Sequence, residues 1–120
     1  KVKEENNPDA NGVYQVCDEQ PEFPGGMTAC MQFLAKNIKY PADCMKEGIQ
    51  GRVIIQLVVD KDGSIQDTKV VRSIHPSLDK EALRVANLMP KWIPGKVNGK
   101  DVRCRFTIPM MFRLDKEIKK

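Results

Sequence analysis

The sequence has few of the residues on which most enzymatic and metal-binding chemistry depends. Its 120 residues include a single histidine, His75. One histidine cannot supply a histidine-rich zinc site, and no nucleophile motif accompanies it that would complete a catalytic triad. The sequence also lacks the nucleophile elbow GxSxG, the P-loop and the dinucleotide-binding GxGxxG. We therefore expect a protein that is not an enzyme and that needs no cofactor or metal.

Long hydrophobic runs and a strong net charge are missing as well. No apolar run approaches the ~20 residues of a transmembrane helix, and nothing after Lys1 resembles a signal peptide. Twenty Lys and Arg against sixteen Asp and Glu give a net charge of +4, which by itself is too weak to indicate nucleic acid as a partner. The proportions of 41% hydrophobic and 30% charged residues are typical of one small globular domain.

Four cysteines are present, and none of them forms the CxxC pair that is typical of metal and redox sites. In an oxidising compartment some of them would pair. Cys30 on the first predicted helix and Cys44 on the second are the best candidates for a disulfide, and the alternative is that both remain thiols. Cys104 falls on the apolar face of the last predicted strand, which predicts a buried free thiol.

Hydrophobic spacing predicts three helices. A break at Pro21–Gly26 precedes the first helix, which ends at Tyr40-Pro41 because a residue before proline disfavours the α conformation. Pro41 starts a short second helix that Gly48 ends. The third helix begins at Pro76-Ser77, with Ser77 as N-cap, and Pro90 ends it. The buried stripe of the first helix is predicted to contain Met27, Cys30, Met31, Leu34 and Ile38.

Alternating hydrophobicity predicts the strands. Val53–Val59 and Ile65–Ser73 flank the turn residues Asp60–Gly63 and form a hairpin. Lys91–Lys100 is predicted to be a loop onto which Trp92 packs, and the long strand from Val102 to Leu114 closes the fold. The result is an α+β domain, a small antiparallel three-stranded sheet with helices packed on one face. Val13–Val16 is a candidate for one added N-terminal strand.

These elements divide the chain into three parts. Residues 1–20 are expected to form a tail or linker with that short strand, residues 21–115 the folded domain, and residues 116–120 a C-terminal tail. Asp60 and Asp62 could begin a calcium loop, but its twelfth position would be Val71 where a glutamate is needed. We therefore interpret this segment as a tight turn, and His75 as a loop or surface residue.

The closing strand has the marks of a sheet edge. It tolerates Pro109, which lacks a backbone donor, and it carries Arg103, Arg105 and Arg113 on its polar face. These features either protect the edge against aggregation or mark a docking edge to which an extended peptide adds as a strand.

Several motifs, in this order, resemble the TonB C-terminal domain family. They are Tyr40-Pro41, Gly51-Arg52-Val53, Asp62-Gly63, Trp92 followed by Pro94-Gly95-Lys96, and the alternating closing strand. The similarity covers about residues 38–114. The sequence PEFPGG followed by a helix is similar to the extended version of the domain in Bacteroidetes-type members.

The resemblance implies a periplasmic domain of an energy transducer, anchored in the inner membrane by a helix outside this chain that contacts an ExbB/ExbD-like motor. Family members capture the TonB box of outer-membrane transporters by strand addition and couple the proton gradient to import. By the same resemblance, the partner would contact Asn37, Ile38, Lys39, Tyr40, Pro41, Val102, Arg103, Cys104, Arg105, Phe106, Thr107, Ile108, Met110 and Phe112. Pairing of Val13–Cys17 with the closing strand would instead occupy this edge.

Other partners stay open at this point. The same domain type occurs as an interaction or signalling module fused to membrane sensors and peptidases. An open edge also permits a homodimer with exchanged strands. A cell-wall or polyanion binder, for example one that contacts peptidoglycan, would use the cations Lys91, Lys96, Lys100, Arg103 and Arg105.

Overall fold

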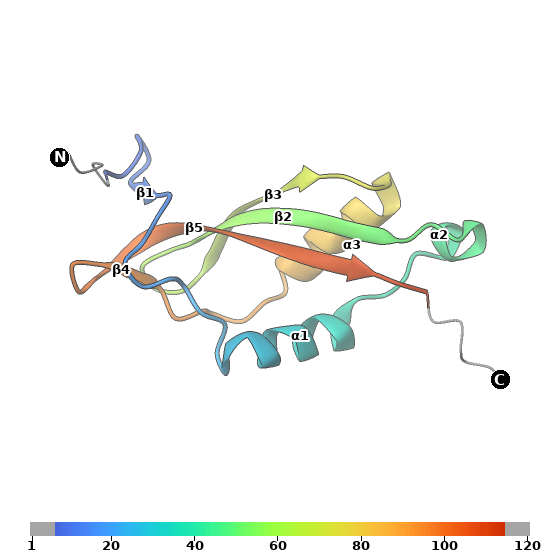
Figure 1. The fold of residues 1–120 in the computed structure, drawn as a ribbon, viewed down its shortest axis with the longest axis horizontal. Helices are drawn as coiled ribbons and strands as arrows, with labels where there is room; N and C mark the ends of the chain where they lie inside the picture. Colours follow the sequence, from blue (N-terminus) through green and yellow to red (C-terminus); the bar gives the residue numbers. More distant parts are fainter. Residues whose placement is uncertain (1–6, 115–120) are drawn as a thin grey trace.

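The computed structural model describes residues 7–114, and the predicted tail segments 1–6 and 116–120 lie outside this range. In chain order the elements are β1 (Val13–Tyr14), α1 (Gly26–Asn37), α2 (Ala42–Glu47), β2 (Gly51–Val59), β3 (Ile65–Arg72), α3 (Pro76–Ala86), β4 (Gly95–Val97) and β5 (Lys100–Phe112). Figure 1 shows β5 and β2 as two long strands side by side, with α1 running along β5. None of the described helices has the length and hydrophobicity needed to cross a bilayer.

The α+β class and the order of the predicted elements are confirmed, but the sheet is larger than predicted. It has five strands in the order β1-β5-β2-β3, with β4 paired to β5. β2 pairs antiparallel with β3 and β5, whereas β1 pairs parallel with β5, so the sheet is mixed rather than purely antiparallel. The hairpin of β2 and β3 around Asp60–Gly63 is the one that the alternating pattern predicts.

β4 replaces part of the predicted loop Lys91–Lys100. Its pairing with β5 leaves Asn98 and Gly99 between the paired residues Val97 and Lys100. Both turn residues have positive φ, 53° and 77°, which a two-residue hairpin turn of this kind requires. The Asn-Gly dipeptide was therefore the local signal for a hairpin, and the loop prediction did not use it.

The core lies between one face of the sheet and the helices. Val53, Ile55, Leu57 and Val59 of β2 alternate into it, and Leu78, Ala82 and Val85 meet them from α3. Trp92 is 4% exposed and packs edge-on against Phe23 and Phe106, which confirms its predicted role in holding the loop to the core. From α1 only Cys30 and Leu34 are buried. Met27 and Met31 are exposed, contrary to the predicted stripe.

The start of α3 differs from the prediction in the residue that caps it. His75 occupies the N-cap position, where its Nδ1 accepts a hydrogen bond from the backbone N–H of Ser77 at 3.1 Å. Pro76 follows at the first helical position, which needs no intrahelical donor. Ser77 instead donates its hydroxyl to Asp43 Oδ2 at 2.7 Å. His75 therefore has a defined structural role instead of being a free loop residue.

The prediction that Cys104 is a free thiol is wrong, because Cys17 is bonded to Cys104. The candidate bridge between Cys30 and Cys44 is not formed, and the alternative that both remain thiols is the correct one. Both free cysteines are completely buried in the core cluster. The sequence did not reveal the bond because it depends on β1 lying beside β5, a contact between residues far apart in the chain. Residues 7–20, expected to be a tail or linker, are held to the sheet by this bond and by the short β1.

Candidate docking edge on β5

β5 is paired along only one of its two edges for most of its length. β2 pairs with Cys104–Phe112 in continuous register. On the opposite edge β1 is the neighbour, and it pairs only with Arg103 and Cys104. Within residues 7–114, no strand pairs with Arg105–Phe112 on that edge. Val13–Cys17 thus covers the beginning of the predicted docking edge and leaves the rest open.

Pro109 shows which backbone groups face this open edge. The pairing of β2 and β5 passes through Ile54↔Pro109 without a register shift. A proline fits such a ladder when the position of its missing N–H faces away from the neighbouring strand. Because backbone groups alternate sides along a strand, the N–H groups of Arg105, Thr107 and Met111 then also face outward, that of Arg105 toward the end of β1. Beyond β1, the open edge offers the donors of Thr107 and Met111 and the outward carbonyls.

The arginines of the closing strand hold the N-terminal segment. Arg103 donates to the carbonyl of Asn11 at 2.6 Å and to Gln66 Oε1 at 2.8 Å. Arg105 donates to Gln15 Oε1 at 3.1 Å and lies 3.5 Å from the carboxylate of Asp9. The backbone N–H groups of Val13 and Asn11, with help from these arginines, lower the pKa of Asp9. Both arginines therefore have partners within the chain already.

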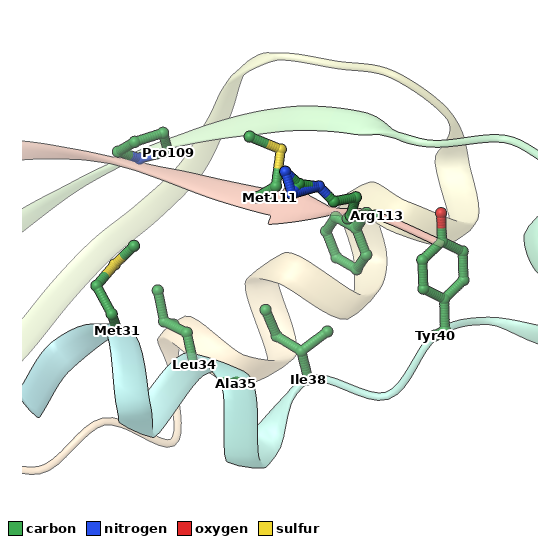
Figure 2. Close-up of a pocket in the computed structure, with 9 residues that line it drawn as sticks. Met31, Leu34, Ala35, Ile38, Tyr40, Pro109, Met111 and Arg113 are labelled. Atoms are coloured by element: carbon green, nitrogen blue, oxygen red, sulfur yellow. The ribbon is translucent and has the colours of Figure 1, made fainter. Parts of the chain in front are cut away.

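A cavity of about 350 Å³ adjoins the far end of the open edge. Figure 2 shows Met31, Leu34 and Ile38 of the α1 region pointing toward β5, with Met111 and Arg113 above them and Tyr40 at one end. Met111 is 49% exposed and Met31 52%, so an apolar surface is accessible here. The lining residues are Met31, Leu34, Ala35, Ile38, Tyr40, Pro109, Met111, Phe112 and Arg113.

The segment before Pro41 is fixed in place at this cavity. The Tyr40 hydroxyl donates to the carbonyl of Ile49 at 2.5 Å, and its ring meets Phe112 edge-on at 5.8 Å between centroids. Burial raises the pKa of the Tyr40 phenol. The backbone N–H of Lys39 donates to Glu81 Oε2 at 2.7 Å, and Arg84 donates to the carbonyl of Asn37 at 2.9 Å. The last two bonds tie the segment between Ile38 and Tyr40, which line the cavity, to α3.

The structure brings together only part of the predicted contact residues. Ile38, Tyr40 and Phe112 meet at the cavity, and Thr107 is exposed on the open edge. Ile108 and Met110 are buried in the core, so a partner could reach only their backbone. Val102 pairs with β4, and Pro41 is the N-cap of α2. Arg103, Cys104 and Arg105 lie where the N-terminal segment is held.

Sequence reasoning missed Met31, Pro109, Met111 and Arg113 as residues of this cavity. Met31 was placed in the core because helical spacing shows which residues share a face but not how far the helix lies from the sheet. The pair Met110-Met111 carried a usable signal. Because consecutive residues of a strand point to opposite faces, one of the two methionines must lie on the polar face, where a large apolar side chain is unusual.

Asp43, Cys44 and His75 place metal-ligand atoms within 4.8 Å of one another. Each of these side chains already serves the junction of α2 and α3. His75 Nδ1 caps α3 and lies 3.3 Å from Cys44 Sγ, while Asp43 accepts hydrogen bonds from Ser77 and from the N–H of Cys44. Burial raises the pKa of the Cys44 thiol, which disfavours the thiolate that a metal would need. This cluster therefore has a structural role.

The cations considered for polyanion binding are mostly paired with acids. Lys91 lies 3.8 Å from Asp62, Lys96 lies 2.5 Å from Asp101, and Arg103 lies 3.4 Å from Asp60. Such pairing lowers the local positive potential, so the loop is a poor site for a polyanion.

Comparison with known proteins assigns this fold to a family. Residues 36–114, more than half of the chain, match the family described as Gram-negative bacterial TonB protein C-terminal. Protein TonB from two strains of Xanthomonas campestris pv. campestris is 31% identical over 91 residues, which cover 72% of this chain and 40% of those proteins. The chain therefore belongs to the TonB C-terminal domain family, and it matches less than half the length of these curated relatives.

Solved structures support the same assignment. Two solution structures of the TonB C-terminal domain from Helicobacter pylori superpose with a TM-score of 0.55 each. One is 25% identical and covers 76% of this chain and 96% of its own, and the other is 26% identical and covers 75% and 82%.

Proposed function

We propose that this chain is the docking domain of a TonB-type energy transducer that binds the TonB box of outer-membrane transporters by strand addition to β5. The observation that carries the proposal is the unpaired edge over Arg105–Phe112, beside an apolar cavity. Unpaired N–H and C=O groups in a row are a template for an extended segment. Membership of the TonB family supports the choice of an outer-membrane transporter as the partner.

Strand addition suits a domain that transmits a pull. Each backbone hydrogen bond contributes only about 0.5–1.5 kcal/mol net, so several in register are required to hold a partner. β5 can supply them because β2 fixes its other edge along nine paired residues. The sheet then distributes a load applied to β5 over a long ladder.

We place the domain in the periplasm, where it would be tethered through a membrane helix outside this chain and coupled to a proton-driven motor of the ExbB/ExbD kind. The Cys17–Cys104 disulfide supports an oxidising compartment. The proposal describes a binding domain with no catalytic step, and contact with peptidoglycan or with a second copy is not needed for it.

The test is NMR titration of the ¹⁵N-labelled domain with peptides from the N-terminal segments of outer-membrane transporters. We expect shifts concentrated in residues 105–113 and 37–41. Thr107→Pro removes an outward backbone donor while the β2 ladder stays intact, so it should weaken binding at least about tenfold. Thr107→Ala, which keeps the donor, is the matched control and should bind like the parent protein. Shifts confined to residues 91–100, or equal binding by Thr107→Pro, would overturn the proposal.

A further inference from the structure

A second cavity adjoins the same edge of β5, nearer its start. It has a volume of about 390 Å³ and lies where Phe23, Met27, Trp92 and Phe106 meet. Met27 belongs to α1 and Phe106 to β5, the same two elements that form the first cavity. Because α1 and β5 run in the same direction (Figure 1), the two cavities follow one another along the space between them. We call them together the α1–β5 groove.

The walls of the α1–β5 groove have properties of a binding surface. Met27 is 57% exposed, and with Met31 and Met111 it places three accessible methionines along the groove. Methionine is flexible and polarizable and is over-represented at adaptable binding surfaces. Trp92 lines the second cavity and its indole Nε1, although buried, has no hydrogen-bond partner among the described residues.

Much of this groove lies ahead of the region that defines the family. The family match begins at residue 36, whereas Phe23, Met27 and Met31 precede it. The open edge alone would accept many extended segments, since backbone pairing depends little on side chains. Discrimination among extended segments would then come from the side chains of α1, which form the other wall of the groove opposite the open edge of β5.

The spacing of the two cavities can be estimated along both walls. On β5 and just beyond it, the lining residues of the first cavity, Pro109 to Arg113, lie three to seven residues after Phe106, or roughly 10–24 Å at the rise of a strand. On the α1 side, Met31 to Ile38 lie four to eleven residues after Met27, or roughly 6–17 Å at the rise of a helix. The two ranges overlap at roughly 10–17 Å, which an extended segment spans in three to five residues, and of these separations only four puts both side chains on the same face.

We propose that the α1–β5 groove selects a transporter segment that carries two apolar side chains four residues apart, one for each cavity. This inference rests on the proposed strand addition at β5 and adds the sequence that the segment must have. The two ends of the groove carry opposite charges, since Arg113 lines the first cavity and Glu22 the second. A bound segment with an acidic residue beside its anchor in the first cavity would therefore be favoured.

The test uses fluorescein-labelled decapeptides with a threonine-rich host sequence and two leucines. The second leucine is placed at position i+3, i+4 or i+5 relative to the first. Fluorescence anisotropy should show the spacing of four binding about tenfold more tightly than the spacings of three or five. An odd spacing turns one leucine to the opposite face, and burial of one leucine side chain corresponds to an effect of that order. NMR shifts with the same peptides report whether residues 105–112 are engaged.

Variants then separate the groove from the edge. Met27→Ser and Met31→Ser should each reduce affinity for the doubly anchored peptide about fivefold to tenfold. Met45→Ser is the matched control, because Met45 is equally exposed at 53% but lies on α2 and lines neither cavity. If all spacings bind equally while residues 105–112 still shift, the spacing rule is wrong and strand addition stands. If no peptide shifts residues 105–112, the proposed function itself is wrong.

Discussion

Cys17 is bonded to Cys104 across a sequence separation of 87 residues, and the bond fixes the segment around β1 to the closing strand. A bond that closes so long a loop restricts the unfolded chain strongly, and native disulfides in small domains typically contribute about 2–4 kcal/mol.

We expect Cys17→Ser to lower the free energy of unfolding by about that amount, measured by urea denaturation under oxidising conditions. Reduction of the parent protein with dithiothreitol should have the same effect. Dithiothreitol should leave the stability of Cys17→Ser itself unchanged. A further loss there would show that dithiothreitol does not act through the Cys17–Cys104 bond alone and would contradict the prediction.

Gly63 allows the β2–β3 turn to contact the loop that carries Trp92. The N–H of Trp92 donates to the carbonyl of Gly63 at 2.8 Å, and a Cβ at Gly63 would lie 2.1 Å from the carbonyl oxygen of Trp92. Gly63→Ala should therefore cost more than about 3 kcal/mol, since backbone must move as well as adopt a strained φ of +89°. Gly48→Ala is the control. It has φ +69° but open space around it, so about 1–2 kcal/mol is expected in chemical denaturation.

The N-cap of α3 gives a prediction that distinguishes capping from other roles of His75. Asparagine is among the best N-cap residues, whereas alanine cannot accept the hydrogen bond from Ser77. His75→Asn should keep most of the stability, and His75→Ala should lose about 1 kcal/mol more. Thermal unfolding of the two variants measures the difference. An equal loss in both variants relative to the parent protein would contradict the capping role and indicate the contact of His75 with Cys44, which both variants lack.

The lowered pKa of the Glu81 carboxyl makes the stability of the fold depend on pH in acid. Hydrogen bonds from Arg84 and from the N–H of Lys39 lower the pKa of Glu81 below its ordinary value of 4.5. Because the folded pKa is depressed, this contribution is present above pH 4.5 and is lost as pH falls through the lower folded value.

Glu81→Gln should be about 1 kcal/mol less stable at pH 7, and the difference should shrink as the pH falls below 4.5, followed by urea denaturation between pH 7 and pH 3. Arg84→Gln should reduce the same pH dependence, because it removes the main hydrogen-bond donor. A difference between parent and Glu81→Gln that is constant over this range would contradict the assignment.

The pattern of the sequence predicted those parts of the fold that depend on neighbours in the chain. The alternation in β2 and β5, the turn at Asp60–Gly63 and the end of α2 at Gly48 are all local effects of side-chain period and of backbone freedom. The α3 prediction placed the helix correctly but assigned the cap to Ser77, because serine is a preferred N-cap residue and histidine is not, whereas in the folded protein Nδ1 of His75 accepts the capping bond.

The candidate site could be predicted only in part for the same reason. The closing strand and Tyr40 were identified, but Met31 and Met27 were assigned to the core. Periodicity puts a residue on a face of a helix, and the distance between that face and the sheet decides whether the residue is buried. α1 stands far enough from β5 to leave two cavities, and so its methionines face an open groove.

The sequence by itself determined the α+β class, the long alternating strand and the likeness to the TonB family, since these follow from local spacing and turn chemistry. Only the tertiary structure decided which cysteines pair, how much of the β5 edge β1 covers, and that α1 leaves a groove beside that edge. These features depend on contacts between residues distant in the chain, and local preferences do not specify such contacts.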